Sequence, residues 1–331
     1  MLSALTSPHE LIRNSFVCDA VWPIRPQYEN SYDSLGRFKK AGFDLVSVTL
    51  AGDKHNISEA VQMVAAHRRQ VLSQPDKFVL FETMADIDRA RHEDKLCIMF
   101  HFEGSRSYER NIDMIEVFFQ LGVRFNLLAF NNHNSAGGGA IEENDPGLTA
   151  YGRRVVREMD RVGMLLDLSH TGRRTTMDAM EVYTKAPIFS HQGADAVFAH
   201  PRNITDEQMK ACAARGGVCG VTGANMYIGD DHCKAESFFR HVDYIASLIG
   251  PDHVGLGIDV IFNGKELDKF FRSRPDEWPF VLDPNWPGAK TLVPEQLLEL
   301  VEIMQAHGYD ESAIQGIVGG NFHRVFAGHW Q

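Results

Sequence analysis

Eight short apolar runs, separated by stretches with helical periodicity, constrain the fold of this chain more than any other feature of its sequence. They occupy residues 15–21, 43–50, 96–102, 123–130, 163–169, 186–190, 216–222 and 253–259. Nearly continuous apolar strands are typical of a parallel sheet that is covered on both faces. Eight such strands alternating with helices predict an α/β fold, a (β/α)8 TIM barrel, with a doubly wound open sheet as the alternative.

Two of the predicted helices are marked by the residues at their ends. Thr205 stands at an N-cap position, Gln208 completes a capping box with it, and Gly216 ends that segment. A later helix has Pro294 in its first turn and ends at Gly308. These signals place helices between the predicted strands, as the barrel requires.

No linker, low-complexity tract or repeat interrupts this pattern, so we expect a single domain over residues 1–331. The longest irregular stretches each follow a predicted strand and cover residues 131–147, 223–235 and 260–290. In a barrel, the segments that follow the strands form the walls of the active site.

The charge balance and the ends of the chain exclude several classes of partner. The formal net charge is -11 and no block of lysines and arginines occurs, so we expect no nucleic-acid partner. Neither end carries an apolar segment typical of a signal peptide or a membrane anchor, so we expect no membrane partner. Five scattered cysteines without a Cys-x-x-Cys pair argue against disulfides and against a thiolate zinc site. We therefore expect a cytoplasmic protein.

Four predicted strands end in a titratable side chain, namely Glu103, His170, His191 and Asp259. Barrel enzymes carry their catalytic groups at these strand ends. A single buried histidine there is more often a core residue with its hydrogen bonds satisfied than a ligand. Four such groups favour a metal site, because neutral imidazoles and a carboxylate suit a cation such as zinc and leave a position open for water.

Longer motifs surround these residues. They read "GLTAYGRRVVREMDRVGMLLDLSH", "APIFSHQGADAVFAHPRNITDEQMKACAARGGVCGV", "DHVGLGID" and "GIVGGNFHRVF". From about residue 95 to its end, the chain resembles the renal or membrane dipeptidase family (peptidase family M19) of the amidohydrolase superfamily. The resemblance implies an amidohydrolase-like (β/α)8 barrel with a two-metal, usually dizinc, site. It also implies hydrolysis of dipeptides, often with a D-residue at the C-terminal position, and a homodimer.

The resemblance assigns a role to each matching residue. Glu103 matches the carboxylate that bridges the two metals, and His170 and His191 match the imidazoles of one metal site. Asp259 matches an aspartate of the other site that also handles the proton of the attacking water. Arg202 in "HPRN" matches the arginine that holds the carboxylate of the substrate, a role that suits the bidentate geometry of a guanidinium.

The chain departs from the family pattern in two places. Where the family has an Asp-x-His-x-Asp stretch in its first strand, Val21 and Pro23 replace the two metal ligands. In the fourth-strand motif, Phe130 stands where the family has His or Tyr. We expect Asn131 and His133, which follow it, to contact the substrate.

These substitutions remove two ligands of one metal and leave the other metal site intact. We therefore expect one divalent cation, zinc, rather than two, with Asp259 acting as a general base. An alternative is that Asp19 or His101 rebuilds the second site. Side chains alternate along a strand, so we expect Asp19 to face the barrel interior like Val21, and His101 to face it like Glu103.

The sequence thus predicts a metal-dependent hydrolase of dipeptides or related small amides that carry a free carboxylate. One alternative is a barrel that has lost catalysis and only binds a small carboxylate ligand. Another is a hydrolase of a different small amide, because Phe130 makes the pocket more apolar.

Overall fold

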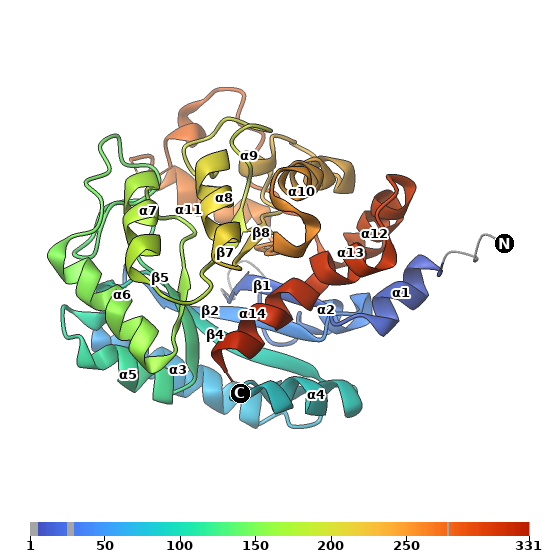
Figure 1. Cartoon of the computed structure of the whole chain (residues 1–331), viewed down its shortest axis with the longest axis horizontal. Helices are drawn as coiled ribbons and strands as arrows, with labels where there is room; N and C mark the ends of the chain where they lie inside the picture. The colour runs from blue at the N-terminus through green and yellow to red at the C-terminus, as the bar shows by residue number, and fades with distance from the viewer. Residues whose placement is uncertain (1–5, 25–29, 277, 331) are drawn as a thin grey trace.

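The eight predicted strands form one parallel sheet that curves into a nearly closed barrel (Figure 1). The computed structural model describes residues 6–24, 30–276 and 278–330. In sheet order the strands are β1 (Cys18–Pro23), β2 (Leu45–Gly52), β4 (Leu96–Glu103), β5 (Val123–Leu127), β6 (Leu165–Asp167), β7 (Ile188–Gln192), β8 (Val218–Val221) and β9 (Val254–Leu256). The barrel prediction is confirmed. A short strand that was not predicted, β3 (Phe78–Leu80), pairs with β4 outside this order.

Helices surround the strands, as Figure 1 shows. They are α1 (Pro8–Asn14), α2 (Gly36–Ala41), α3 (Ile57–Leu72), α4 (Met84–His92), α5 (Asp113–Gln120), α6 (Ala150–Val162), α7 (Arg173–Val182), α8 (Asp206–Ala214), α9 (Asn225–Ile228), α10 (Ala235–Ile249), α11 (Gly264–Arg272), α12 (Leu297–Ala306), α13 (Glu311–Gln315) and α14 (Asn321–His329). The capping box of Thr205 and Gln208 at the start of α8 is confirmed. Pro294 lies in a 3-10 turn, Pro294–Gln296, that leads directly into α12.

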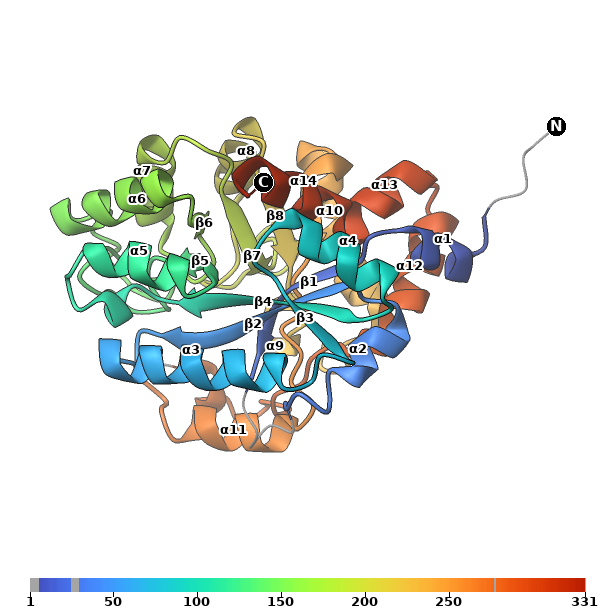
Figure 2. The same ribbon diagram turned by 90° about the horizontal axis from the view of Figure 1, so that it is seen from below.

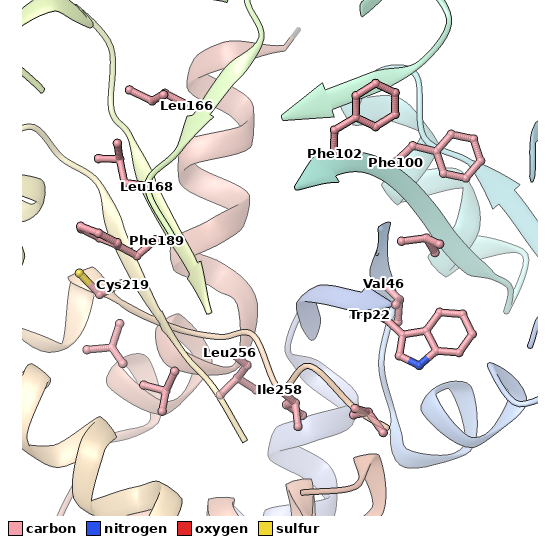
Figure 3. Packing of buried hydrophobic residues seen from close by; sticks show 14 of the residues in the cluster. Trp22, Val46, Phe100, Phe102, Leu166, Leu168, Phe189, Cys219, Leu256 and Ile258 are labelled. Carbon is pink, nitrogen blue, oxygen red and sulfur yellow. The ribbon is translucent and has the colours of Figure 1, made fainter. Parts of the chain in front are cut away.

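The main hydrophobic core fills the space between the strands and the surrounding helices. Figure 3 shows part of it, with Trp22 and Val46 from β1 and β2 near Phe100 and Phe102 from β4. These side chains are fully buried. Because they point outward from the strands, the alternate residues of β4, His101 and Glu103, point into the barrel.

The stretch 260–290 is not purely irregular, as the sequence suggested, because it contains α11 and a 3-10 turn. Together with α9, it forms a separate apolar cluster. Figure 2 shows the ribbon of α11 at the lower edge of the molecule, with α9 above it. We call its aromatic members the aromatic cap: Tyr227, Phe270, Phe271, Trp278, Phe280 and Trp286. The cap lies over the ends of the strands, where the loops of a barrel meet.

The first strand departs from regular alternation. The register of β1 against β2 shifts between Asp19 and Trp22, which marks a bulge. Asp19 Oδ1 accepts hydrogen bonds from the backbone N–H of Val21 (3.3 Å) and of Ile258 (2.9 Å). Its carboxylate therefore connects β1 to the segment that follows β9. Among the described residues, these two strands at the ends of the sheet do not pair with each other. The expectation that Asp19 simply repeats the orientation of Val21 is wrong.

Two further expectations concern cysteines and membrane segments. All five cysteines are unpaired and buried in this structure. Within the described ranges, no helix combines the length and the apolar character needed to cross a bilayer.

Candidate metal centre and active site

Three predicted ligands converge at the carboxyl ends of their strands. Glu103 ends β4, His170 lies three residues beyond β6, and His191 is on β7. Their ligand atoms all lie within 4.8 Å of one another. The Nε2 atoms of the two histidines are 2.8 Å apart, and His191 Nε2 is 3.8 Å from Glu103 Oε1. Ligands around a tetrahedral zinc ion stand about 3.3 Å apart, so this donor set fits one divalent cation.

Burial keeps both imidazoles in the form that binds a cation. Desolvation and the charge of Arg202 lower the pKa values of His170 and His191 well below the ordinary value. The rings are therefore neutral at pH 7, and each has one nitrogen with a free electron pair. Ser190 Oγ lies 2.7 Å from Nδ1 of His191 and orients that ring.

Nδ1 of His170 has two competing neighbours. Asn131 Oδ1 lies 2.7 Å from this nitrogen, and Arg202 Nε donates to it at 2.9 Å. An imidazole nitrogen either donates or accepts, so a single tautomer of His170 satisfies only one of these contacts. A cation on Nε2 requires the proton on Nδ1, which is the tautomer that donates to Asn131. The structure thus places Asn131 against the imidazole rather than in the wall of a substrate cavity.

The guanidinium of Arg202 is also engaged by protein groups. Beyond His170, it donates to Gln192 Oε1 and to the backbone oxygen of His191 (3.0 Å). Its Cζ atom lies 5.4 Å from the centre of the Tyr227 ring. Arg202 is only 1% exposed. It therefore stands behind His170 and Tyr227, and binding a substrate carboxylate requires it to exchange one of these bonds. That role stays a prediction.

Two cavities open beside the three ligands. The inner cavity has a volume of about 110 Å³, and Glu103, His170 and Asp259 line it. The outer cavity has a volume of about 260 Å³, and it includes Asp53, Lys54, Arg106 and His133 in its wall. Glu103, Phe130, Phe270 and Trp278 line both cavities. The structure therefore brings Glu103, His170 and His191 together, and Asp259 lines the same inner cavity as the first two.

Asp259 is suited to proton transfer. Burial raises its pKa to about 6, although the positive charge of Arg202 lowers it. A carboxylate with such a pKa is ionised at neutral pH and basic enough to accept a proton from water.

Three residues of this site have a strained backbone. Asn131, His170 and Asp259 adopt left-handed φ angles of 62°, 60° and 60°. This conformation costs about 1 kcal/mol or more for a residue other than glycine, and such costs are typical of functional sites.

Phe130 stacks on His170, with ring centres 4.0 Å apart. Its backbone N–H donates to Asp53 Oδ2 at 2.9 Å. His133, the other residue predicted to contact substrate, lines the outer cavity, but its backbone and its ring both bond Glu142. Sequence reasoning missed Asp53, although its place directly after the second strand was a usable signal.

The aromatic cap was missed as well. Tyr227, Phe271 and Trp278 line the inner cavity, together with Met226, Leu267 and Phe270. The signal was the unusual aromatic content of "KFFRSRPDEWPF" within a stretch interpreted as a loop. A loop that is rich in aromatic residues after a barrel strand indicates a pocket wall.

On the first-strand side of the site, the described residues offer no ligand. Val21 is fully buried, and Pro23 lines the inner cavity without a donor atom. His101 has Ser47 Oγ at 2.8 Å from Nδ1 and Thr49 Oγ1 at 2.8 Å from Nε2, so both of its nitrogens are engaged. Among the described residues, neither Asp19 nor His101 joins a group of potential metal ligands. The alternative of a rebuilt second site therefore finds no support.

Comparison with known proteins agrees with this geometry. The family model for membrane dipeptidase (peptidase family M19) matches residues 9–268. Dipeptidase 3 of Mus musculus is 26% identical over 83% of this chain, and the match spans 52% of the mouse protein. The chain thus spans about half the length of this relative.

Solved structures agree over nearly the whole chain. An amidohydrolase from Pseudomonas aeruginosa has 26% identity and a TM-score of 0.88, covering 98% of this chain and 99% of its own. A metallo peptidase from Rhodobacter sphaeroides, liganded with a phosphinate mimic of the dipeptide L-Ala-D-Ala, shares the fold at 19% identity. Its TM-score is 0.78, with 96% of this chain and 100% of that chain covered. The chain therefore belongs to the membrane dipeptidase family, peptidase family M19, and to the hydrolases of the amidohydrolase superfamily.

Proposed function

We propose that this protein hydrolyses dipeptides with the help of one zinc ion held by Glu103, His170 and His191. The observation that carries the proposal is the convergence of these three donor atoms beside a cavity that Glu103 and His170 line together with Asp259. When bound there, a divalent cation polarises a carbonyl oxygen and lowers the pKa of water.

Asp259 is the proton carrier of the proposed reaction. Its carboxylate accepts a proton from the water that attacks the scissile carbonyl carbon. It then passes this proton to the nitrogen of the leaving residue as the C–N bond breaks, giving one amino acid with a new carboxylate and one with a free amine. The apolar walls around Asp259 exclude bulk water and strengthen its interaction with charge in the site.

We propose one ion rather than two because of the first strand. Val21 and Pro23 cannot bind a cation, and both ring nitrogens of His101 are engaged by hydroxyl groups. Asp19 forms its hydrogen bonds through Oδ1 alone, but among the described residues its carboxylate joins no group of potential metal ligands. Three protein ligands are enough for a catalytic zinc, which keeps a position open for water.

The substrate class draws support from the dipeptide mimic bound by the Rhodobacter relative. In this chain, we propose that Arg202 receives the free carboxylate of the substrate after exchanging one of its present bonds. The homodimer and the cytoplasmic location stay predictions, which size-exclusion chromatography and cell fractionation test.

The first experiment measures zinc per chain by elemental mass spectrometry on protein purified without chelator, together with dipeptide hydrolysis. We expect about one equivalent of zinc and turnover, with both lost in His170→Ala. Two equivalents would contradict the single-ion site. Zinc binding without turnover of any dipeptide would favour the alternative of a barrel that only binds a carboxylate ligand.

A further inference from the structure

The two cavities that meet at Glu103 differ in chemistry. The inner cavity is lined almost entirely by apolar and aromatic side chains apart from Glu103, His170 and Asp259. The outer cavity carries Lys54, His55, Arg106, Asn132, His133 and Asn134 in its wall. A substrate whose scissile bond lies at Glu103 must extend into both, so its two residues meet different surroundings.

Proton transfer decides which residue enters which cavity. Asp259, which lines only the inner cavity of the two, has to reach the nitrogen of the leaving residue. The leaving residue of a dipeptide is the C-terminal one, so it occupies the inner cavity. Arg202 stands behind Tyr227 on the same side, where the carboxylate of that residue would lie. The N-terminal residue then points into the outer cavity.

The inner cavity selects an apolar side chain. Phe271 and Trp278 pack against each other with ring centres 4.4 Å apart, and both are about 5% exposed. A charged side chain placed against this wall would lose its hydration, and a neutral donor such as Nε1 of Trp278 would not neutralise its charge. The C-terminal residue is therefore apolar.

The outer cavity has the opposite preference. Asp53, a carboxylate in its wall, already accepts bonds from the backbone N–H of Phe130 (2.9 Å) and of Arg106 (3.0 Å) and from Asn134 Nδ2 (2.9 Å). Glu103, the other carboxylate, is assigned to the cation. Arg106 and Lys54 add two positive charges to this wall, and Lys54 Nζ lies 4.8 Å from the centre of the Phe270 ring. A carboxylate entering the cavity is attracted to this side.

We infer that the enzyme prefers dipeptides with an acidic N-terminal residue, aspartyl or glutamyl, and an apolar C-terminal residue. This inference rests on the proposed function and adds to it the substrate class. Arg106 and Lys54 determine specificity at the first position, and the aromatic cap determines it at the second.

The test compares kcat/KM of the zinc-loaded full chain on Glu-Leu, Gln-Leu, Lys-Leu and Leu-Glu, each with an L- and a D-configured C-terminal residue. Gln matches Glu in shape, so this pair isolates the charge. We expect Glu-Leu to exceed Gln-Leu by about fivefold, the size of an exposed ion pair. Lys-Leu and the reversed dipeptide Leu-Glu are expected to be slower still.

Variants of the outer cavity test whether its wall causes the preference for an acidic N-terminal residue. Arg106→Gln and Lys54→Gln are each expected to reduce the Glu-Leu to Gln-Leu ratio toward one. Arg13→Gln removes the same charge from an exposed position on α1, away from both cavities, and is expected to leave the ratio unchanged. Equal rates on Glu-Leu and Gln-Leu, or a ratio insensitive to Arg106 and Lys54, would overturn the inference and leave the proposed function standing. Absence of turnover on every dipeptide would overturn both.

Discussion

The two sides of the candidate site use polar side chains for different purposes. On the β4 to β7 side, Glu103, His170 and His191 direct their donor atoms at a common point. On the β1 side, Asp19 bonds backbone N–H groups, and the buried Asn30 donates to the backbone oxygens of Pro23 (2.8 Å) and Val260 (2.6 Å). Polar side chains near the strand ends thus serve as potential metal ligands on one side of the site and form hydrogen bonds to the backbone on the other.

The largest expected effect on zinc binding comes from removing a ligand on the β4 to β7 side. His170→Ala removes one of three donors, so zinc affinity should fall at least about a hundredfold and turnover should be lost. Chelator competition measures the affinity, and circular dichroism checks that the variant folds. Full zinc retention in a folded variant would mean that the cation is bound elsewhere.

Asp259→Asn separates chemistry from cation binding. We expect kcat to fall by about 10² to 10⁴ because the amide cannot accept the proton, while zinc content stays near one equivalent. Steady-state kinetics and elemental analysis on the same sample measure both quantities. Loss of zinc in this variant would instead make Asp259 a ligand.

Asn131 and Arg202 compete for Nδ1 of His170, so substitutions of these two residues should change zinc affinity in opposite directions. Asn131→Leu removes the acceptor for the Nδ1 proton and should weaken binding by about ten- to a hundredfold. Arg202→Met removes the competing donor and a nearby positive charge, so binding should tighten. Arg202→Lys keeps the charge and separates the two causes. Effects of the same sign in Asn131→Leu and Arg202→Met would show that the two residues do not compete.

The pH dependence of catalysis follows from Asp259. Because burial raises the pKa of Asp259 to about 6, its basic form is lost as the pH falls through that value. We expect log kcat/KM to decline with a slope of about one below pH 6 and to level above it. Zinc content measured at each pH controls for loss of the cation. An unchanged profile in the residual activity of Asp259→Asn would assign the inflection to another group.

The smallest expected effect on zinc binding comes from a substitution on the β1 side. Val21→Ala should leave zinc stoichiometry and affinity unchanged and lower the free energy of unfolding by about 2 kcal/mol, because the side chain is fully buried. Denaturant unfolding and chelator competition measure the two quantities. A change in zinc affinity would show that the β1 side still contributes to the metal site.

The sequence predicted the parts of this site that depend on periodicity and strand ends. Apolar runs located all eight barrel strands, and Glu103, His170, His191 and Asp259 meet because parallel strands end on the same side. The strand β3 was missed because its apolar run, residues 78–81, is shorter than the runs of the predicted strands. The bulge after Asp19, the contacts of Arg202 and the aromatic cap depend on residues far apart in the chain, and no local pattern encodes them.

The bond between Asp19 and the N–H of Ile258 joins residues 239 positions apart, one on the first strand and the other just past the last. Because so long a loop must close before it forms, the ends of the barrel meet late in folding. We expect the native barrel to open first at this seam, since no strand ladder crosses it in the described part of the chain. Amide hydrogen exchange at Ile258 would therefore report a partial opening of the barrel that precedes global unfolding.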